Sequence, residues 1–302
     1  MAPAPAQTLG TILGEYALPA RGLAAGDLDH PITGYAVENA GDLFVIAFVF
    51  ADTSGVSFPD TLRLSSFDRV AGVWTHAAIE RRRLGEPGRD IGSVVAIHPT
   101  ARHVFLDTHG NPSAGTLLVF TRDLAPVAAL DGWLLRLLPG GLAVYHQSMI
   151  HFAPTHSAEL RLYDADSGRD VTLYPREPDG PVRRRYVAAT RQQYARVGAD
   201  WFRNNNHPMD PRRFTSALRD SLVTNAAGTA LAFLMRFGNE AATPVATPLL
   251  DVVVHCRQVR STQPQCSETE LATLQRRHPR WDTSRILHSL LGRDPAALRG
   301  PP

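Results

Sequence analysis

The sequence predicts a mainly β fold built from repeated four-stranded antiparallel units. Two observations predict it. Between Gly92 and Pro175 the chain carries two successive sets of four short apolar runs: SVVAIHP, HVFLDTH, GTLLVFTRD and PVAALDG, then WLLRLLP, LAVYHQ, AELRLYDADSG and RDVTLYP. Gly, Pro, Asp or Asn separates these runs, as is typical of turns between paired strands. A set of four strands that is used twice indicates a repeat architecture.

Similar runs lie before and after this repeat. An earlier unit is expected to comprise four strands at 32–37, 42–51, 62–67 and 73–79. The second of these is apolar at nearly every position, which is typical of a strand that is buried on both faces. Later strands are expected at 221–225, 229–237 and 250–256. Because these are only three, a further strand expected at residues 8–18 would supply the fourth if the units close into a ring.

The turns between the third and fourth runs of successive units indicate the length of the repeat. They align at Asp68, Asp123 and Asp166, which are 55 and 43 residues apart. Four-stranded repeats of about 40–50 residues are typical of propeller blades. The chain therefore resembles β-propellers at the level of the fold, although it has no WD-repeat signature. The resemblance implies four or five blades, and the alternative is a β-sandwich with an α-helical appendage.

Two helical segments interrupt or follow the strands in this interpretation. A helical insertion is expected at about 180–219, since Asp179 precedes Gly-Pro as a helix N-cap and apolar residues then recur at helical spacing. C-terminal helices are expected at 267–292, where Ser267 to Glu270 form a capping-box pattern. The whole chain, 1–302, is then a single domain whose blades occupy 8–175 and 220–256.

The basic residues exclude several classes of enzyme. All 31 residues of the combined Lys and Arg count are arginine. A pyridoxal Schiff base, a Walker-A phosphate loop and a Ser–Lys dyad each need a lysine, so these chemistries are excluded. No cofactor or metal motif is present, and none is expected to bind. The net charge of +2 is too small to predict a nucleic-acid partner, and no apolar window is long enough to predict a membrane span.

Two cysteines and the N-terminal segment give indications of the compartment. Cys256 and Cys266 are ten positions apart, a spacing that suits a disulfide across a hairpin if the chain is exported. The start, MAPAPAQ, lacks the charged and apolar regions of a signal peptide but resembles a small-residue cleavage flank. We therefore expect a periplasmic or secreted protein, with a cytoplasmic protein as the alternative.

Four polar residues in the repeat are the candidate site. Asp107 and His109 share one face of their strand, because side chains alternate along a strand, and could form an acid–base or ligand-binding pair. Aligning the two copies places His146 at the position equivalent to Asp107. His151 lies in a longer loop that could cover a pocket. The alternative is that the histidines lie in solvent at strand ends and that Asp107 caps a turn.

Two functions remain open from the sequence. The first is a non-catalytic domain that binds a small molecule or a protein, which the absence of nucleophile motifs favours. The second is a hydrolase or lyase that acts on a polar small molecule or glycan through Asp107, His109 and His146.

Overall fold

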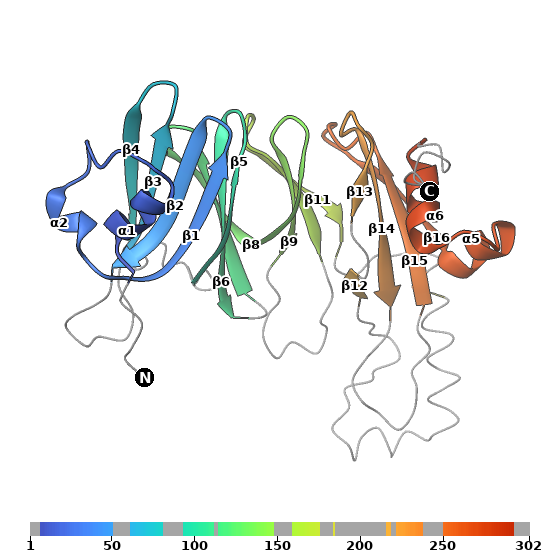
Figure 1. The fold of residues 1–302 in the computed structure, drawn as a ribbon. Helices are drawn as coiled ribbons and strands as arrows, with labels where there is room; N and C mark the ends of the chain where they lie inside the picture. The colour runs from blue at the N-terminus through green and yellow to red at the C-terminus, as the bar shows by residue number, and fades with distance from the viewer. Residues whose placement is uncertain are drawn as a thin grey trace, which may run out of the picture. The chain divides into compact units, whose positions relative to one another are not determined.

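The computed structural model describes residues 7–50, 61–80, 93–111, 114–147, 159–175, 184, 216–218, 222–237 and 250–292 (Figure 1). The chain forms two compact units: Met1–Trp133 with Ala165–Gly168, and Leu134–Asp164 with Arg169–Pro302. Antiparallel sheets dominate both units, so the predicted mainly β fold class is confirmed. In the described parts of the chain, no helix is long and apolar enough to cross a membrane.

Unit 1 begins with a four-stranded sheet in the simple order of the chain. Its strands are β1 (Ile32–Ala40), β2 (Leu43–Phe50), β3 (Thr61–Asp68) and β4 (Val73–Glu80). The next sheet of the unit contains β5 (Ser93–Pro99), β6 (His103–Asn111), β7 (Ala114–Thr121) and the first part of β8 (Pro126–Leu138). Each sheet is an antiparallel meander of the kind that forms a propeller blade.

The strand β2 is buried on both faces, as its continuous apolar sequence predicts. On one face, Val45 and Ala47 belong to a core with Val104 and Leu106 of β6. On the other face, Phe44, Ile46 and Phe48 share a core with residues 9–18. The seven residues from Leu43 to Val49 are all buried, so the hydrophobic effect fixes β2 between two layers.

The prediction of a strand at residues 8–18 is wrong. The chain forms the helices α1 (Leu9–Glu15) and α2 (Ala25–Leu28) instead (Figure 1). Leu9, Ile12 and Leu13 lie at helical spacing and are buried against the sheet of β1–β4. The side chains and backbone of Thr8 and Thr11 form a reciprocal capping box that starts α1. These residues therefore cover a sheet face and do not supply a strand.

The strand β8 joins two meanders. The hydrogen-bonded order β5-β6-β7-β8-β9-β10-β11 is continuous, with β9 at Leu142–Gln147, β10 at Leu160–Asp164 and β11 at Arg169–Tyr174. The boundary between the units falls after Trp133, next to Gly132, whose φ of 150° is accessible mainly to glycine. The two sequence copies therefore meet inside one long strand, at the glycine that separates them.

Unit 2 ends in a second independent sheet. Its strands are β12 (Ser216–Leu218), β13 (Val223–Thr224), β14 (Ala230–Phe237), β15 (Leu250–Arg257) and β16 (Gln265–Glu270). Leu142, Val144 and Leu162 of β9 and β10 share a core with Phe233 and Val254 of β14 and β15. With this sheet, the described residues contain four blade-like meanders.

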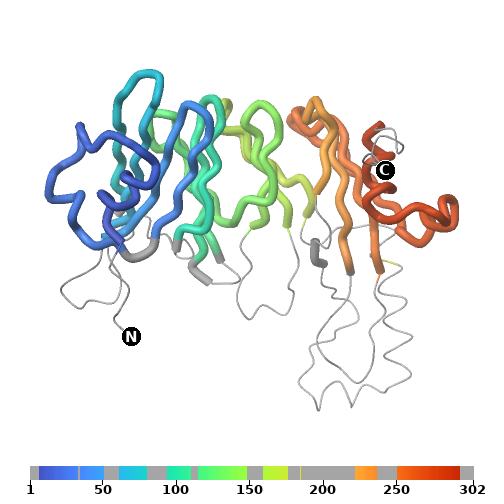
Figure 2. Tube along the Cα trace, viewed as in Figure 1, coloured from blue at the N-terminus to red at the C-terminus, as the bar shows by residue number. Residues whose placement is uncertain are grey.

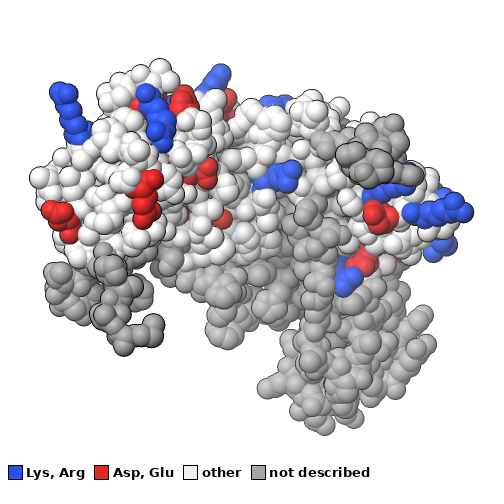
Figure 3. Space-filling model, in the orientation of Figure 1, with Lys and Arg blue, Asp and Glu red and all other residues white. Residues whose placement is uncertain are grey.

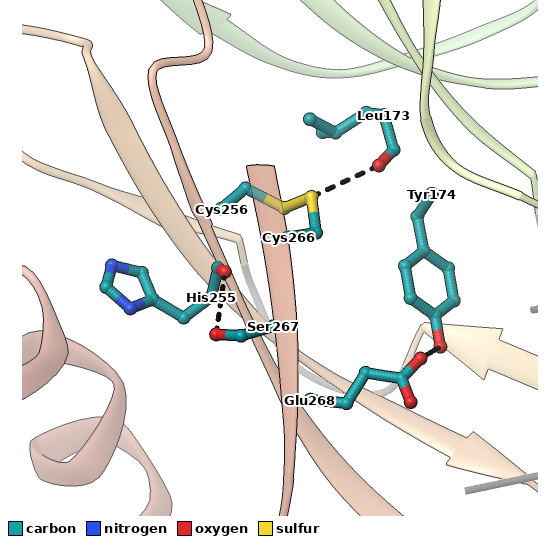
Figure 4. Close-up of a disulfide and its surroundings, with 7 residues drawn as sticks. All are labelled: Leu173, Tyr174, His255, Cys256, Cys266, Ser267 and Glu268. Carbon is teal, nitrogen blue, oxygen red and sulfur yellow. Dashed lines mark hydrogen bonds between the residues drawn. A yellow bond between two sulfur atoms is a disulfide. The ribbon is translucent and has the colours of Figure 1, made fainter. Parts of the chain in front are cut away.

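The last strand of this sheet is β16, a segment that was expected to begin a helix. Ser267–Glu270 is strand, so the capping-box interpretation is wrong. Cys256 and Cys266 are directly opposite each other in the β15–β16 pairing and form the predicted disulfide (Figure 4). Tyr174 of β11 also donates a 2.6 Å hydrogen bond to Glu268. These cross-links hold a polar segment in the sheet where its own sequence favours a helix N-terminus.

Part of the helical prediction is confirmed at the C-terminus. The helices α5 (Leu271–Arg277) and α6 (Thr283–Leu290) flank the expected break at His278–Pro279, and Asp282 caps α6 by accepting the N–H of Arg285 at 2.7 Å. The insertion expected at 180–219 lies outside the described residues except for Arg184 and β12. At β12 the chain is strand, where a helix through Leu218 was expected.

Helices α5 and α6 cover the outward face of the last sheet (Figure 1). Ala232, Leu234 and Val253 on this face pack against Leu271, Ile286 and Leu287 of the two helices. The first sheet of unit 1 is covered in the same manner by α1 and α2. In both units a pair of short helices therefore covers one face of a sheet.

Arginine side chains join the short turns at one end of the sheets. In unit 1, Arg122 contacts the carboxylates of Asp42 and Asp68 at 2.8 and 3.3 Å, and Arg102 contacts Asp166 at 3.0 Å. The backbone N–H groups of residues 71 and 70, together with Arg122, hold the pKa of Asp68 below its usual value.

The same pattern continues in unit 2, where two arginines donate to turn carbonyls. Arg169 donates to Ser261, and Arg260 donates to Pro139. Because guanidinium groups offer several donors in a fixed plane, one arginine can hold two neighbouring turns. Arginines thus brace the short-turn ends of the sheets in both units.

Removing the disulfide should destabilise unit 2. We expect Cys256→Ala/Cys266→Ala to lower the free energy of unfolding by about 2–3 kcal/mol, since the cross-link closes a loop of about ten residues in the unfolded chain. Urea unfolding followed by circular dichroism measures this. A reductant should shift the wild-type midpoint and leave that of the double variant unchanged. Equal midpoints of the wild type with and without reductant would show that the cross-link contributes nothing.

Candidate functional site

The two ends of the unit 1 sheets differ in the length of their connections, except that only residues 112 and 113 lie between β6 and β7. Short turns join β1 to β2, β3 to β4, β5 to β6 and β7 to β8 at the end that carries Arg122. The chain leaves β2 and β4 at the opposite end, through segments 51–60 and 81–92, which lie outside the described residues (Figure 2). The strand β6 runs toward this second end, so Asp107 and His109 approach it.

Asp107 and His109 lie together, on the shared strand face that the sequence predicts. The Nε2 atom of His109 lies 3.8 Å from Oδ2 of Asp107. The side chain of Asp107 is 9% exposed and that of His109 is 39% exposed. The pair therefore has a shielded carboxylate and an imidazole that solvent or a ligand can reach.

Trp133 completes an aromatic edge beside this pair. Its ring centroid lies 5.8 Å from that of His109, with the two planes tilted by 56°. Trp133 is partly buried and follows Gly132, whose backbone conformation ends the unit 1 part of β8. Sequence reasoning did not single out this tryptophan. No local signal in the sequence could have found it, because its contact with His109 depends on which strands pair in the sheet.

The floor of the site is apolar and tightly packed. Asp107 pairs with Leu117 of β7, and His109 pairs with Gly115. Leu117 and the neighbouring Phe105 are fully buried. A Cβ atom at Gly115 would lie 2.6 Å from the carbonyl oxygen of Thr108 and 3.3 Å from Cδ2 of His109. A glycine at 115 is therefore needed for the imidazole to occupy its present position.

The other two predicted site residues, His146 and His151, stay predictions. His146 lies on β9 in unit 2, is 7% exposed and pairs with Leu160. It is on the same strand face as Val144, which belongs to the unit 2 core. Asp107 and His146 belong to different units, and the hypothesis that they share one site stays a prediction. His151 lies outside the described residues.

A second polar cluster, on the sheet of unit 2, was not predicted. Arg161 lies between the carboxylates of Glu159 and Asp170, each at 3.1 Å, and Tyr145 donates a 2.9 Å hydrogen bond to Asp170. Burial, reinforced by the charge of Asp170, raises the pKa of Tyr145, which stays a neutral donor. Tyr145, Arg161 and Thr172 are cross-strand partners. Because the acceptors and donors satisfy one another, this cluster serves to order the sheet.

The chemistry available at the Asp107–His109–Trp133 cluster is that of polar recognition. A carboxylate accepts hydrogen bonds, an imidazole can donate and accept them, and an indole ring offers an apolar face. Among the described residues, no three His, Cys, Asp or Glu side chains are placed to hold a metal ion. Both cysteines are in the disulfide, so neither is a thiol nucleophile.

Comparisons with known proteins give similarity only at a low level. No family model matches the sequence, and no curated protein matches it. Among solved structures, the chain is similar to the β-propeller domain of the Trilobed protease from Pyrococcus furiosus, with 5% identity and a TM-score of 0.36 over 80% of this chain and 59% of that one. It is also similar to HIRA(644-1017), with 8% identity and a TM-score of 0.32 over 73% of this chain and 54% of that one.

The chain thus spans between half and two thirds of the length of these structures. The propeller-type architecture itself is evident in the strand order, since each described meander has the chain-order antiparallel pairing of a blade.

Substituting Gly115 should disturb the site through the backbone. We expect Gly115→Ala to lower the free energy of unfolding by about 1–3 kcal/mol, because the added methyl group would meet the carbonyl of Thr108. The ring resonances of His109 should shift in the same variant. Gly14→Ala is the matched control, since no atom lies within 4 Å of a Cβ there. Unchanged stability and unchanged His109 resonances in Gly115→Ala would contradict the close packing.

Proposed function

We propose that the chain is a non-catalytic binding domain whose ligand site is the Asp107–His109–Trp133 cluster of unit 1. The observation that carries the proposal is a buried carboxylate beside an imidazole that contacts a tryptophan ring, at the end of the sheets where β2 and β4 lead into long connections. Binding residues in repeat folds gather on connections and strand ends, while the sheets between them act as a rigid support.

The geometry of the cluster favours binding over catalysis. A general base must come within about 2.6–3.2 Å of the proton it removes, directly or through one water. Asp107 is shielded, and its Oδ2 atom lies 3.8 Å from Nε2 of His109. With no lysine in the chain and both cysteines cross-linked, neither an amine nor a thiol side chain can act as a nucleophile. The alternative of a hydrolase or lyase would instead use Asp107 and His109 as its acid and base.

The ligand that suits this cluster is rich in hydroxyl groups and has an apolar face. A sugar ring meets both requirements, because its C–H face packs on an indole while its hydroxyl groups bond to carboxylate and imidazole. We therefore propose a soluble oligosaccharide or a similar polar molecule. The disulfide supports an exported, periplasmic or secreted location, where such ligands are met outside the reducing cytoplasm.

The test is calorimetric titration of the purified chain with neutral hexasaccharides of glucose, xylose, mannose and N-acetylglucosamine. At least one should bind, and Trp133→Ala and Asp107→Asn should each weaken its binding at least tenfold through the loss of stacking or of an acceptor. Arg136→Ala, an exposed change on the unit 2 part of β8, is the control and should bind normally.

Two results would overturn this proposal. The first is that no hexasaccharide binds, or that binding is indifferent to both substitutions. The second is that the chain shortens the bound saccharide and that Asp107→Asn abolishes this, which would establish the hydrolase or lyase alternative.

A further inference from the structure

We propose that the exposed surface of α5 and α6 in unit 2 binds an acidic segment of a partner protein. This surface consists of Arg276, Arg277, Arg280 and Arg285, around Trp281, and is called the arginine surface below. It is separate from the cluster at Asp107, so it would add a protein-binding function to the proposed ligand binding.

The charge of the protein is concentrated on this surface. Residues 271–292 contain four arginines and a single acidic residue, Asp282, which gives a net charge of +3. The whole chain has 31 basic and 29 acidic residues and a net charge of only +2. The rest of the protein is therefore close to neutral. Figure 3 shows the arginine side chains gathered where Figure 1 places α5 and α6.

These arginines are not used to brace the fold, in contrast to those of the turns. Arg122 and Arg236 each contact a carboxylate within about 3 Å. Within the described part of the chain, no carboxylate lies in ion-pair range of the four arginines of the arginine surface. Arg276 donates only to the hydroxyl of Thr273, at 2.9 Å. The charges of the four arginines therefore remain available to bind an anionic group of another molecule.

The packing of the helices presents these side chains outward. Leu271, Ile286 and Leu287 point into the sheet and are buried. Arg276, Arg277 and Arg280 are exposed, on the last turn of α5 and in the connection to α6. Because the apolar faces of α5 and α6 pack on the sheet, the helices cannot rotate to remove these arginines from solvent.

Trp281 fixes the centre of the surface. The ring of His278 stacks on it in parallel, with centroids 3.9 Å apart, and the guanidinium carbon of Arg285 lies 5.1 Å from its centroid. A cation over an indole ring is attracted by the electron density of that face. The tryptophan thereby holds two nitrogen-rich side chains in a defined arrangement, which reduces the entropy lost when an anion binds.

The chemistry of the surface favours a carboxylate-rich peptide over the other anionic macromolecules. Single-stranded nucleic acids bind where bases can stack on aromatic rings, and the ring of Trp281 already contacts His278 and Arg285. Helices that lie on membranes insert an apolar face, and here Ile286 and Leu287 are buried against the sheet. The planar, forked guanidinium group matches the two oxygens of an Asp or Glu carboxylate.

The experiment measures binding of a fluorescein-labelled peptide of ten glutamates to the full chain by fluorescence anisotropy. We expect binding that weakens at least tenfold between 50 and 200 mM NaCl, because the contacts are between exposed charges. Arg277→Glu/Arg280→Glu should weaken binding at least tenfold at 50 mM NaCl. The control, Arg21→Glu/Arg136→Glu, makes the same change in net charge at exposed positions elsewhere and should bind within twofold of the wild type.

Several outcomes would overturn the proposal. Absence of binding at 50 mM NaCl, or equal losses in both double variants, would show that no specific acidic-peptide site exists. A ten-nucleotide RNA, or phosphatidylserine vesicles, binding tenfold more tightly than the peptide through the same two arginines would assign the surface to another partner. Circular dichroism spectra of both variants that match the wild type exclude unfolding as the cause. The saccharide titration is unaffected by these substitutions, so the two proposals fail separately.

Discussion

The first and last sheets of this protein each present two apolar faces, and both faces must be kept from water. The strand β2 shows the constraint most clearly, since its residues are buried on both sides, by β6 and its neighbours on one face and by α1 and α2 on the other. In unit 2, β14 and β15 are enclosed between the core with β9 and β10 and the helices α5 and α6. At about 25 cal/mol for each Å² of apolar surface, this coverage is the main source of stability.

That constraint separates the supporting parts of the molecule from the parts that are free to bind. Arginines join the short turns at one end of the sheets, and the other end carries the long connections and the Asp107–His109–Trp133 cluster. The helices that cover the last sheet pack one face against the core, and their other face does not contact the sheet. In α5 and α6 the remaining face carries positive charge without a partner in the described structure. Both proposed binding surfaces thus lie at positions where packing of the core does not determine the residue type.

The sequence predicted most of the strands, because strand periodicity and turn residues are local signals. It also predicted the disulfide and the contact of Asp107 with His109, since both depend on side-chain alternation and spacing. It failed where tertiary contacts decide the outcome. The pattern of residues 8–18 predicted a strand, but these residues form a helix whose apolar side chains cover the first sheet. Ser267–Glu270 read as a helix start, but the bond to Cys256 and the hydrogen bond from Tyr174 hold them in the sheet. Trp133 was missed because nothing local shows which residues approach His109.

Short helices cover one face of the first sheet and one face of the last sheet. Hydrogen–deuterium exchange followed by mass spectrometry tests it most directly, because covered helices exchange slowly and fraying ones do not. We expect α1 and α6 to be protected from exchange to nearly the same degree as β2 and β15. Protection of α6 should fall in Leu234→Ala, because this change removes part of the face on which α6 packs. Exchange of α1 and α6 at the rate of an unstructured peptide, with β2 and β15 still protected, would contradict it.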